Sequence, residues 1–445
     1  MRPAFYTASE IVERVMPLVG KRTGMVGPSV EIPLTAGNAE ICVYGAPVPN
    51  LQPLSRLLEI TNEDGSVSGT GASLYRELAH AKAYCEALER YCNVVPGAKP
   101  IIVATRDELG EDAVDMELFP RCSDEEYAHP RNTLVPPNNK AKMRWVEGYS
   151  LIDGRPQWVP LVSAYVGIPF EYPDEVFSLP ISTGCALAAS YEQAVASGIG
   201  EAIERDALML AWYHRLPLPR VDVSAYTDPE FLERMRRVER AGVRQIFFDA
   251  TTDLGVATIY ALQIAPNSPL YALLMAATRL RPSDTLSKVI EEAAGSRFGL
   301  EKSLQQPLSF DVRDYRNFRR LTDGALFYGD SANFKAFDFL FKGVGERRIE
   351  ELPVLETGDP EANLARLVDI FRQRNLELLV VDLTLPQVRD IGMYVVKVIA
   401  PQLVPLSPDY NSRFTAMPRL YEAPARMGYP VKAPHELNPW PQPFA

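Results

Sequence analysis

Two glutamate pairs in this chain have a spacing that could hold a metal ion. Glu201 and Glu204 lie three residues apart, and so do Glu86 and Glu89. In a helix, residues three apart share one face, so each pair presents two carboxylates side by side. Such like charges repel each other unless a cation lies between them. Carboxylate oxygens suit Mg²⁺, a hard cation that is usually shared with substrate phosphates.

The motif Glu-x-x-Glu-Arg is also common on solvated helix faces, and one copy alone favours that interpretation. The neighbouring residues favour a site instead, because both pairs stand among apolar side chains such as Ala83, Leu88, Ile199 and Ile203. Carboxylates in such company are expected to be partly buried. Buried charges need a charged partner or a metal ion.

The two pairs belong to two similar stretches, Ser68–Tyr91 and Ser182–Trp212. Each has a small-residue turn, an Ala-rich helical run and an E-x-x-E-R motif, with 15 residues from Gly71 to Glu86 and 17 from Gly184 to Glu201. Two such helices side by side would place four carboxylates around one cavity. This predicts a Mg²⁺–nucleotide site formed without a glycine-rich P-loop.

These stretches resemble those of YcaO-domain proteins, whose members bind ATP through glutamates on such paired helices. The resemblance extends from roughly Ser68 to the C-terminus and is closest to the cyclodehydratases that form azoline rings in ribosomal peptides. Two further motifs carry it: an E-A-A-G-S-R helix end at Arg297, and the late passage VVDLTLPQVRDIGMYVVKVIAPQLVPL at 380–406.

The resemblance implies which residues form the site. The four glutamates would hold Mg²⁺, Arg205 and Arg297 would offset phosphate charge, and Ser182 would join the ATP-binding set. Charge compensation of this kind is the usual means of stabilising phosphoryl transfer. Taken without the resemblance, an arginine near a helix C-terminus such as Arg297 is more often a partner of the helix dipole.

The chain ends in Asn-Pro-Trp-Pro-Gln-Pro-Phe-Ala, with Pro439, Pro441 and Pro443 at alternate positions. Proline stiffens an extended segment and removes backbone donors. Azoline-forming YcaO proteins end in a similar P-x-P-x-P tail that reaches toward the active site. This chain departs from that pattern in finishing on Ala445 and in carrying Gln442 where a histidine is common. No catalytic base can be named, and the tail is the candidate that the resemblance implies.

The resemblance implies an ATP- and Mg²⁺-dependent enzyme that activates backbone amides of a ribosomally made precursor peptide and forms thiazoline or oxazoline rings. One alternative is the same domain acting with another nucleophile, which gives a thioamide or an amidine. Another alternative is a non-catalytic scaffold that retains the fold. A conventional kinase or ligase is disfavoured, because neither a Walker motif nor a kinase motif is present.

The composition is that of an ordinary globular protein. The chain has 445 residues, 47% hydrophobic residues and a net charge of −11, which argues against broad binding of nucleic acid. No stretch is long and apolar enough for a membrane span and no signal peptide is evident, so we expect a cytoplasmic protein. The five cysteines form no C-x-x-C motif and are expected to be reduced; Cys85 and Cys92 are interpreted as small apolar residues of a helix.

The predicted fold is α+β, with mixed or antiparallel sheets flanked by helices. Residues 1–60 are expected to form a helix and a hairpin, and residues 61–445 the YcaO domain with its proline-rich tail. About 60 residues are too few for a leader-binding domain fused to an E1-like module, so a separate partner protein is expected to supply that function. A homodimer is a further possibility. The charged and aromatic residues near 313–320 are interpreted as a solvated helix, or else as a basic surface for an acidic partner.

Overall fold

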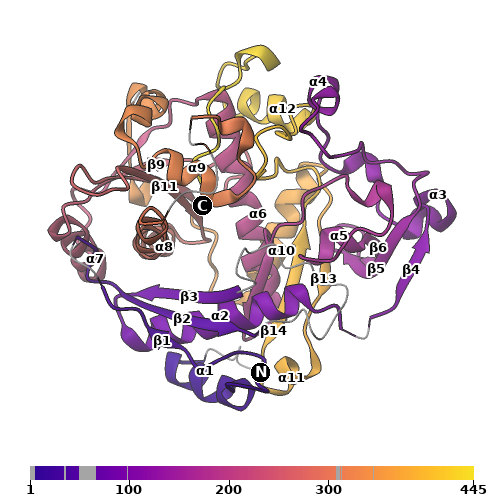
Figure 1. The fold of residues 1–445 in the computed structure, drawn as a ribbon, viewed down its shortest axis with the longest axis horizontal. Coiled ribbons are helices and arrows are strands. Elements are labelled where there is room, and N and C mark those ends of the chain that lie inside the picture. Colours follow the sequence, from indigo (N-terminus) through magenta and orange to yellow (C-terminus); the bar gives the residue numbers. More distant parts are fainter. Residues whose placement is uncertain are drawn as a thin grey trace.

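The computed structural model describes residues 6–34, 37–49, 67–97, 99–306, 311, 313–343 and 345–444. The described strands form three sheets. The helix α6 (Tyr191–His214) runs through the middle of the molecule, with the five-stranded sheet on one side and the six-stranded sheet on the other (Figure 1).

The first sheet is built from the N-terminal part of the chain. It has the antiparallel order β1-β2-β3, with β1 at Val30–Glu31, β2 at Cys42–Val48 and β3 at Val67–Ser73. Helix α2 (Arg76–Val94) packs on β2 and β3, and helix α1 (Ala8–Val15) packs on α2. This sheet therefore carries the first acidic helix.

The second sheet has the strand order β11-β10-β9-β8-β12. Its strands are β8 (Arg220–Asp222), β9 (Arg244–Asp249), β10 (Thr258–Ile264), β11 (Ala272–Thr278) and β12 (Glu346–Arg348), and only the β8–β12 pair is parallel. The helices that accompany it are α7 (Pro229–Arg240), α8 (Pro282–Ser303) and α9 (Leu321–Phe327).

Strand β10 is buried on both faces, and its side chains alternate between two helices. Ile259 and Ala261 pack with Val289 of α8, whereas Tyr260 and its even-numbered neighbours join the cluster around α6. A strand sends successive side chains to opposite faces, so a strand between two helices reads as a continuous apolar run rather than an alternating one.

The third sheet has the order β4-β5-β13-β14-β7, and β6 also pairs with β5. Every strand pair in it is antiparallel. The strands are β4 (Ile101–Ala104), β5 (Met143–Ser150), β6 (Arg155–Pro160), β7 (Cys185–Ala188), β13 (Leu379–Asp382) and β14 (Tyr394–Ile399). Helix α10 (Pro360–Gln373) packs on α6, and the shorter helices are α3 (Arg106–Leu109), α4 (Asp124–Ala128), α5 (Leu161–Ala164), α11 (Pro386–Asp390) and α12 (Pro418–Arg426).

The α+β prediction is confirmed, and so are the two acidic helices; strands β1 and β2 pair as the hairpin expected within residues 1–60. The predicted boundary at residue 60 falls outside the described residues, and the division into two regions stays a prediction. Strand β2, which precedes that boundary, pairs along its length with β3, which follows it.

All five cysteines are free, as expected. Burial raises the pKa of the Cys85 and Cys92 thiols to about 12, so neither is a thiolate at neutral pH. Both lie on α2, in agreement with their interpretation as small apolar residues. None of the described helices combines the length and the apolar character that crossing a membrane requires.

Two local predictions are wrong. Gly69 to Gly71 do not form a turn but lie within strand β3, because β2 pairs with them along the whole segment. The residues near 313–320 do not form a solvated helix: a short 3-10 turn at Tyr315–Asn317 precedes α9, and Phe318 is buried in the core around Trp212. Burial of Phe318 in this apolar core fixes the path of the segment, and its arginines remain exposed at the protein surface.

Candidate active site

Strand β3 crosses helix α2 at very close range. A methyl group at Gly71 would lie 2.0 Å from the carbonyl oxygen of Ala79, and one at Gly69 would lie 2.2 Å from the amide nitrogen of Ala87. Only glycine permits such an approach of one backbone to another. Because the strand lies so near, the amide of Thr70 donates to Glu86 Oε2 at 2.6 Å.

The first glutamate of the second pair is held in the same way. The amide of Gly184 donates to Glu201 Oε2 at 3.1 Å. Gly184 has φ +84°, and a methyl group there would lie 2.2 Å from the carbonyl oxygen of Val398. In both copies, therefore, a glycine-containing segment that packs tightly against its surroundings anchors the first glutamate. The arginine four residues on also contacts it, at 2.6 Å for Arg90 and 3.4 Å for Arg205.

The second glutamate of α6, Glu204, is almost fully buried and richly paired. Its Oε2 accepts from Lys288 Nζ at 3.1 Å and from the amide of Thr278 at 3.0 Å, and its Oε1 lies 3.0 Å from Arg205. Burial alone would raise the pKa of this carboxyl, but Lys288 and Arg205 reverse the effect and lower it. Glu204 is thus held as a carboxylate.

The second glutamate of α2, Glu89, has the opposite environment. It makes neither a hydrogen bond nor a salt bridge with any described residue. Burial raises its pKa well above the ordinary value, and the charges of Glu201 and Glu86 raise it further. The charges of Glu86 and Glu201 both act on Glu89, so the acidic parts of the two helices lie near each other. That the four glutamates share one site stays a prediction.

The pKa values of Glu86 and Glu201 are also raised, chiefly by burial. No group of three or more His, Cys, Asp or Glu side chains within the described ranges is close enough to hold a metal ion in this conformation. The four carboxylates therefore form no ready coordination shell. Their assignment as metal ligands stays a prediction.

Two lysines that the sequence reasoning missed belong to this region. Lys288 of α8 lies between Glu204 and Glu292, at 3.1 Å and 3.0 Å. Lys397 of β14 is buried, donates to the carbonyl of Ile181 at 2.6 Å, and has a pKa that burial lowers. The sequence offers one sign that Lys397 is functional: it is the single lysine of the apolar stretch Val-Val-Lys-Val-Ile, where an uncompensated charge would be unfavourable.

A second ion-pair network fixes α8 beside α2. Glu291 is buried and contacts Lys82 at 2.7 Å and Arg234 of α7 at 3.0 Å. The hydroxyl of Ser73, at the end of β3, also donates to it at 3.3 Å. These contacts hold the helix that carries Lys288 in position against the first acidic helix.

An open cavity of about 340 Å³ lies beside Thr278, whose amide contacts Glu204. It is bounded by the face of α6 that carries Gln193, Ser197 and Gly200, by Thr278 to Leu280 after β11, and by the loop before α10. Thr278 both lines this cavity and donates its amide to Glu204. The size suits a small-molecule ligand, and the shared residue places the cavity at the edge of the acidic region.

Neither Ser182 nor Arg297 contacts any of the four glutamates among the described residues. Ser182 is exposed in the turn before β7, where its carbonyl accepts the amide of Cys185. Arg297 is buried and donates to Gln263, to the carbonyl of Leu270 and to Ser268, all outside the acidic pairs. Nine residues separate it from Lys288, which corresponds to about 13 Å along the helix and to opposite faces. Their roles in binding ATP stay predictions.

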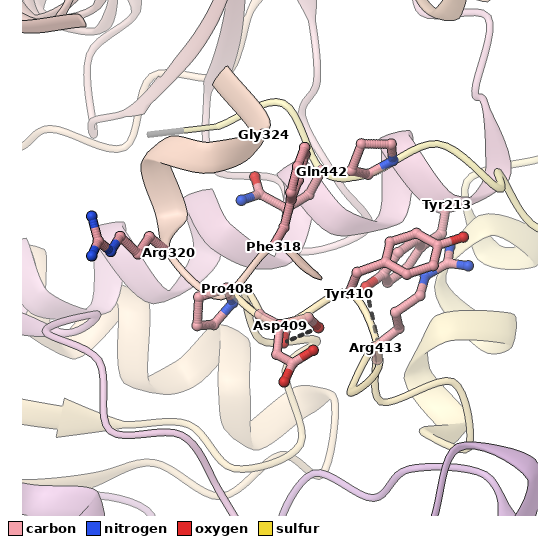
Figure 2. A pocket seen from close by; sticks show the side chains of 11 residues that line it. Tyr213, Phe318, Arg320, Gly324, Pro408, Asp409, Tyr410, Arg413 and Gln442 are labelled. Carbon is pink, nitrogen blue, oxygen red and sulfur yellow. Dashed lines mark hydrogen bonds between the residues drawn. The ribbon is translucent and has the colours of Figure 1, made fainter. Parts of the chain in front are cut away.

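The proline tail is an ordered part of the fold. It lies along the C-terminal half of α6, where Trp212 Nε1 donates to the carbonyl of Trp440 at 3.2 Å. Figure 2 shows Gln442 of the tail across a small cavity from Asp409, Tyr410 and Arg413. The tail thus contacts the same helix that carries Glu201 and Glu204, farther toward its C-terminal end.

A family model described as YcaO cyclodehydratase, ATP- and Mg²⁺-binding, matches residues 68–404, well over half of the chain. The chain belongs to the YcaO family. A relative described as an uncharacterised protein of Methanothermobacter thermautotrophicus is 27% identical over 372 residues, which cover 80% of this chain and 87% of the relative.

Two solved structures extend the comparison. A heterocyclase determined in complex with substrate and cofactor is 25% identical, with a TM-score of 0.79; the match covers all of this chain but only 58% of the heterocyclase. A YcaO protein from Methanopyrus kandleri, bound with AMPPCP and Mg²⁺, is 18% identical, with a TM-score of 0.63, over 89% of this chain and 91% of that one. The second likeness concerns the fold alone.

The donor set of this YcaO chain is compatible with a hard cation. All four candidate side chains are carboxylates, and oxygen ligands are those that Mg²⁺ prefers. A bound cation would offset the unpaired charge of Glu89 most, because its pKa is raised and it has no described partner. Lys288 and Arg205 supply positive charge beside Glu204, where phosphate oxygens could share it.

Proposed function

We propose that this chain is an ATP- and Mg²⁺-dependent cyclodehydratase that forms thiazoline or oxazoline rings in a ribosomally synthesised precursor peptide. The observation that carries the proposal is geometric: buried Glu204 contacts Lys288 and Arg205 at the edge of an open cavity. Carboxylates and cations gathered beside a cavity suit a site for Mg²⁺ and phosphate groups. The family membership and the heterocyclase likeness support the same reaction class.

The chemical problem in azoline formation is the leaving group. After a Cys, Ser or Thr side chain of the peptide has added to the preceding carbonyl, the former amide oxygen must depart, and it leaves poorly on its own. Transfer of a phosphoryl group from ATP to that oxygen makes the departure feasible.

The chain's own residues would hold and neutralise the nucleotide. Glu86, Glu89, Glu201 and Glu204 would bind Mg²⁺, and Arg205 and Lys288 would balance phosphate charge, which is the main task of a protein in phosphoryl transfer. The cavity beside Thr278 would take the rest of the nucleotide. Ser182 and Arg297 are further candidates for contacts with ATP, and the tail with Pro439, Pro441 and Pro443 is the candidate that contributes to catalysis.

We further propose that a separate E1-like or leader-binding protein presents the precursor peptide. The chain spans about 58% of the length of the heterocyclase it matches.

The test combines ATP turnover with peptide mass. The purified chain is incubated with Mg²⁺, ATP, the candidate partner and the precursor peptide. We expect peptide-stimulated ATP hydrolysis and the loss of one water per modified residue, both abolished by Glu201→Gln. The matched control is Glu192→Gln in the first turn of the same helix, which should keep the activity.

Other outcomes would redirect the proposal. Replacement of oxygen by sulfur in the peptide would indicate thioamide formation, and ring closure by a backbone amine would indicate an amidine. If a correct partner and peptide produced neither a mass change nor stimulated hydrolysis, the scaffold interpretation would replace the enzymatic one.

A further inference from the structure

Lys397 is a buried charge in the middle of an apolar strand. It is 5% exposed, and its neighbours in β14 are valines and an isoleucine. Its ammonium group has three hydrogens to donate, and among the described residues the carbonyl of Ile181 is the acceptor found for them. Removing a lysine from water at such a place costs free energy, so its presence indicates a task other than stabilising the fold.

Strand β14 lies between the apolar clusters of the two acidic helices, because successive side chains of a strand point to opposite faces. Val395 lies on the same face as Lys397 and packs in the cluster that contains α2. Val396 and Val398 lie on the opposite face and pack in the cluster that contains α6. Lys397 therefore leaves the strand on the side of α2, whereas its neighbours contact the helix that carries Glu201.

A short segment before β7 connects this lysine to Glu201. Lys397 holds the start of the segment, because its ammonium group donates to the carbonyl of Ile181 at 2.6 Å. The amide of Val398 holds the end of the segment by donating to the carbonyl of Gly184 at 2.8 Å. The amide of Gly184 donates in turn to Glu201 Oε2 at 3.1 Å. A lysine on one face of the sheet is thereby linked to a glutamate on the other.

The segment is packed at backbone distance on both sides. A methyl group added at Gly184 would lie 2.2 Å from the carbonyl oxygen of Val398, and one added at Gly198 of α6 would lie 2.6 Å from the carbonyl oxygen of Gly184. Only glycine permits such close contacts. A shift of the segment would therefore be transmitted to Glu201, which accepts the amide of Gly184.

One carboxylate from each acidic helix also influences Lys397. Burial lowers the pKa of its ammonium group, and the charges of Cys185, Glu201 and Glu89 oppose that shift. Cys185 is the residue opposite Lys397 on the neighbouring strand β7. Negative charges nearby favour the charged form of a lysine. Lys397 thus lies within electrostatic range of both acidic helices.

We propose that Lys397 is a positioning residue that couples the two halves of the candidate site. By holding the segment before β7, it keeps the amide of Gly184 against Glu201 and so sets the orientation in which Glu201 binds a cation. This role rests on the function proposed above, in which Glu201 binds Mg²⁺. It differs from a structural role in its effect on stability, since replacing a buried charged group by an apolar one of similar size is often neutral or stabilising.

The test compares Lys397→Met with Lys302→Met, a change at an exposed lysine in the last turn of α8. The urea midpoint of Lys397→Met should equal or exceed that of the wild type, because the apolar side chain removes a buried charge. Calorimetry should show at least tenfold weaker binding of the non-hydrolysable nucleotide AMPPCP with Mg²⁺. Lys397→Arg, which keeps a donor for Ile181, should bind it within threefold of the wild type. The control should change neither quantity.

Hydrogen exchange decides the role of Lys397 even if the wild type binds no nucleotide, a result that would count against the proposed function alone. In Lys397→Met, mass spectrometry should show exchange of the Gly184 amide at least tenfold faster than in the wild type. The amide of Thr70, which contacts Glu86 on the other acidic helix, should keep its rate.

Three results would overturn the proposed role. The first is an unchanged rate of exchange at Gly184 in Lys397→Met. The second is equal nucleotide affinity in Lys397→Met and a wild type that binds. The third is a urea midpoint of Lys397→Met below that of the wild type, which would assign Lys397 to the stability of the fold instead.

Discussion

The two acidic helices α2 and α6 carry the same motif in opposite electrostatic settings. In both, the first glutamate accepts a backbone amide from a glycine-containing segment, at Thr70 for Glu86 and at Gly184 for Glu201. The second glutamates differ: Glu204 is ion-paired and has a lowered pKa, whereas the pKa of Glu89 is raised well above its ordinary value.

The difference comes from the neighbours of each helix rather than from its own sequence. Lys288 and the amide of Thr278 reach Glu204 from other elements of the fold, and no described residue does the same for Glu89. The repeated motif therefore sets the positions of the carboxylates on their helices, and residues distant in the sequence set their pKa values. Glu204 is neutralised by residues of the fold, and Glu89 has no such partner among the described residues.

The largest effect is expected for Glu204→Gln. The change leaves Lys288 and Arg205 without their shared carboxylate, and breaking a largely buried ion pair destabilises a protein by roughly 3 kcal/mol or more. Urea unfolding should show this loss, and peptide-stimulated ATP hydrolysis should fall at least 100-fold. A stability equal to that of the wild type would show that the pairing of Glu204 contributes little to the fold.

A smaller loss is expected for Gly71→Ala. The added methyl group would meet the carbonyl oxygen of Ala79 at 2.0 Å, so β3 and α2 must move apart, and overpacking of this kind costs about 1–3 kcal/mol. Thermal unfolding measures the effect. Gly242→Ala is an informative control, because φ is positive at that position but no atom lies within 4 Å of the added methyl group.

The opposite sign is expected for Glu89→Gln. Removal of a carboxylate that repels Glu201 and Glu86 and has no described partner should stabilise the metal-free chain by about 1 kcal/mol. The same variant should bind Mg²⁺–ATP at least tenfold more weakly in calorimetry. A destabilised Glu89→Gln variant would contradict the comparison between the two helices.

The pH dependence of stability should separate Glu89 from Glu204. A carboxyl group whose pKa is raised on folding favours the folded state at low pH, and this contribution is lost as pH rises through the folded-state pKa. Metal-free wild type should therefore lose stability relative to Glu89→Gln as pH increases from the ordinary carboxyl range toward neutrality. Glu204, whose pKa is lowered, contributes stability that is lost only on acidification. Unfolding midpoints measured across this range test both signs.

The smallest effect is expected for Arg90→Gln. Arg90 is 40% exposed, and surface ion pairs contribute about 0–1 kcal/mol. The equivalent change Arg205→Gln on α6 should be more harmful, because Arg205 contacts both Glu201 and Glu204 and is 21% exposed. Equal unfolding free energies for the two variants would remove the asymmetry between the helices.

The two acidic helices could be predicted because their signals are local. The helical period places Glu86 and Glu89 on one face, and it does the same for the repeated pair Glu201 and Glu204. The apolar residues around both pairs indicate burial. The predicted turn at Gly69 and Gly71 is a strand in the structure, because these glycines serve close packing on α2 instead of chain reversal. Glycine alone does not distinguish these two uses.

The sequence by itself determined the two acidic helices, the paired carboxylates and a tail whose prolines cannot donate hydrogen bonds. Only the tertiary structure decided which carboxylate is neutralised, because Lys288 lies 84 residues from Glu204 along the chain. It also decided that Arg297 bonds to Gln263 and that the tail is docked by Trp212, Tyr328, Tyr410 and Arg413. Periodicity is a property of neighbouring residues, whereas the charge of a buried group depends on every residue that the fold brings beside it.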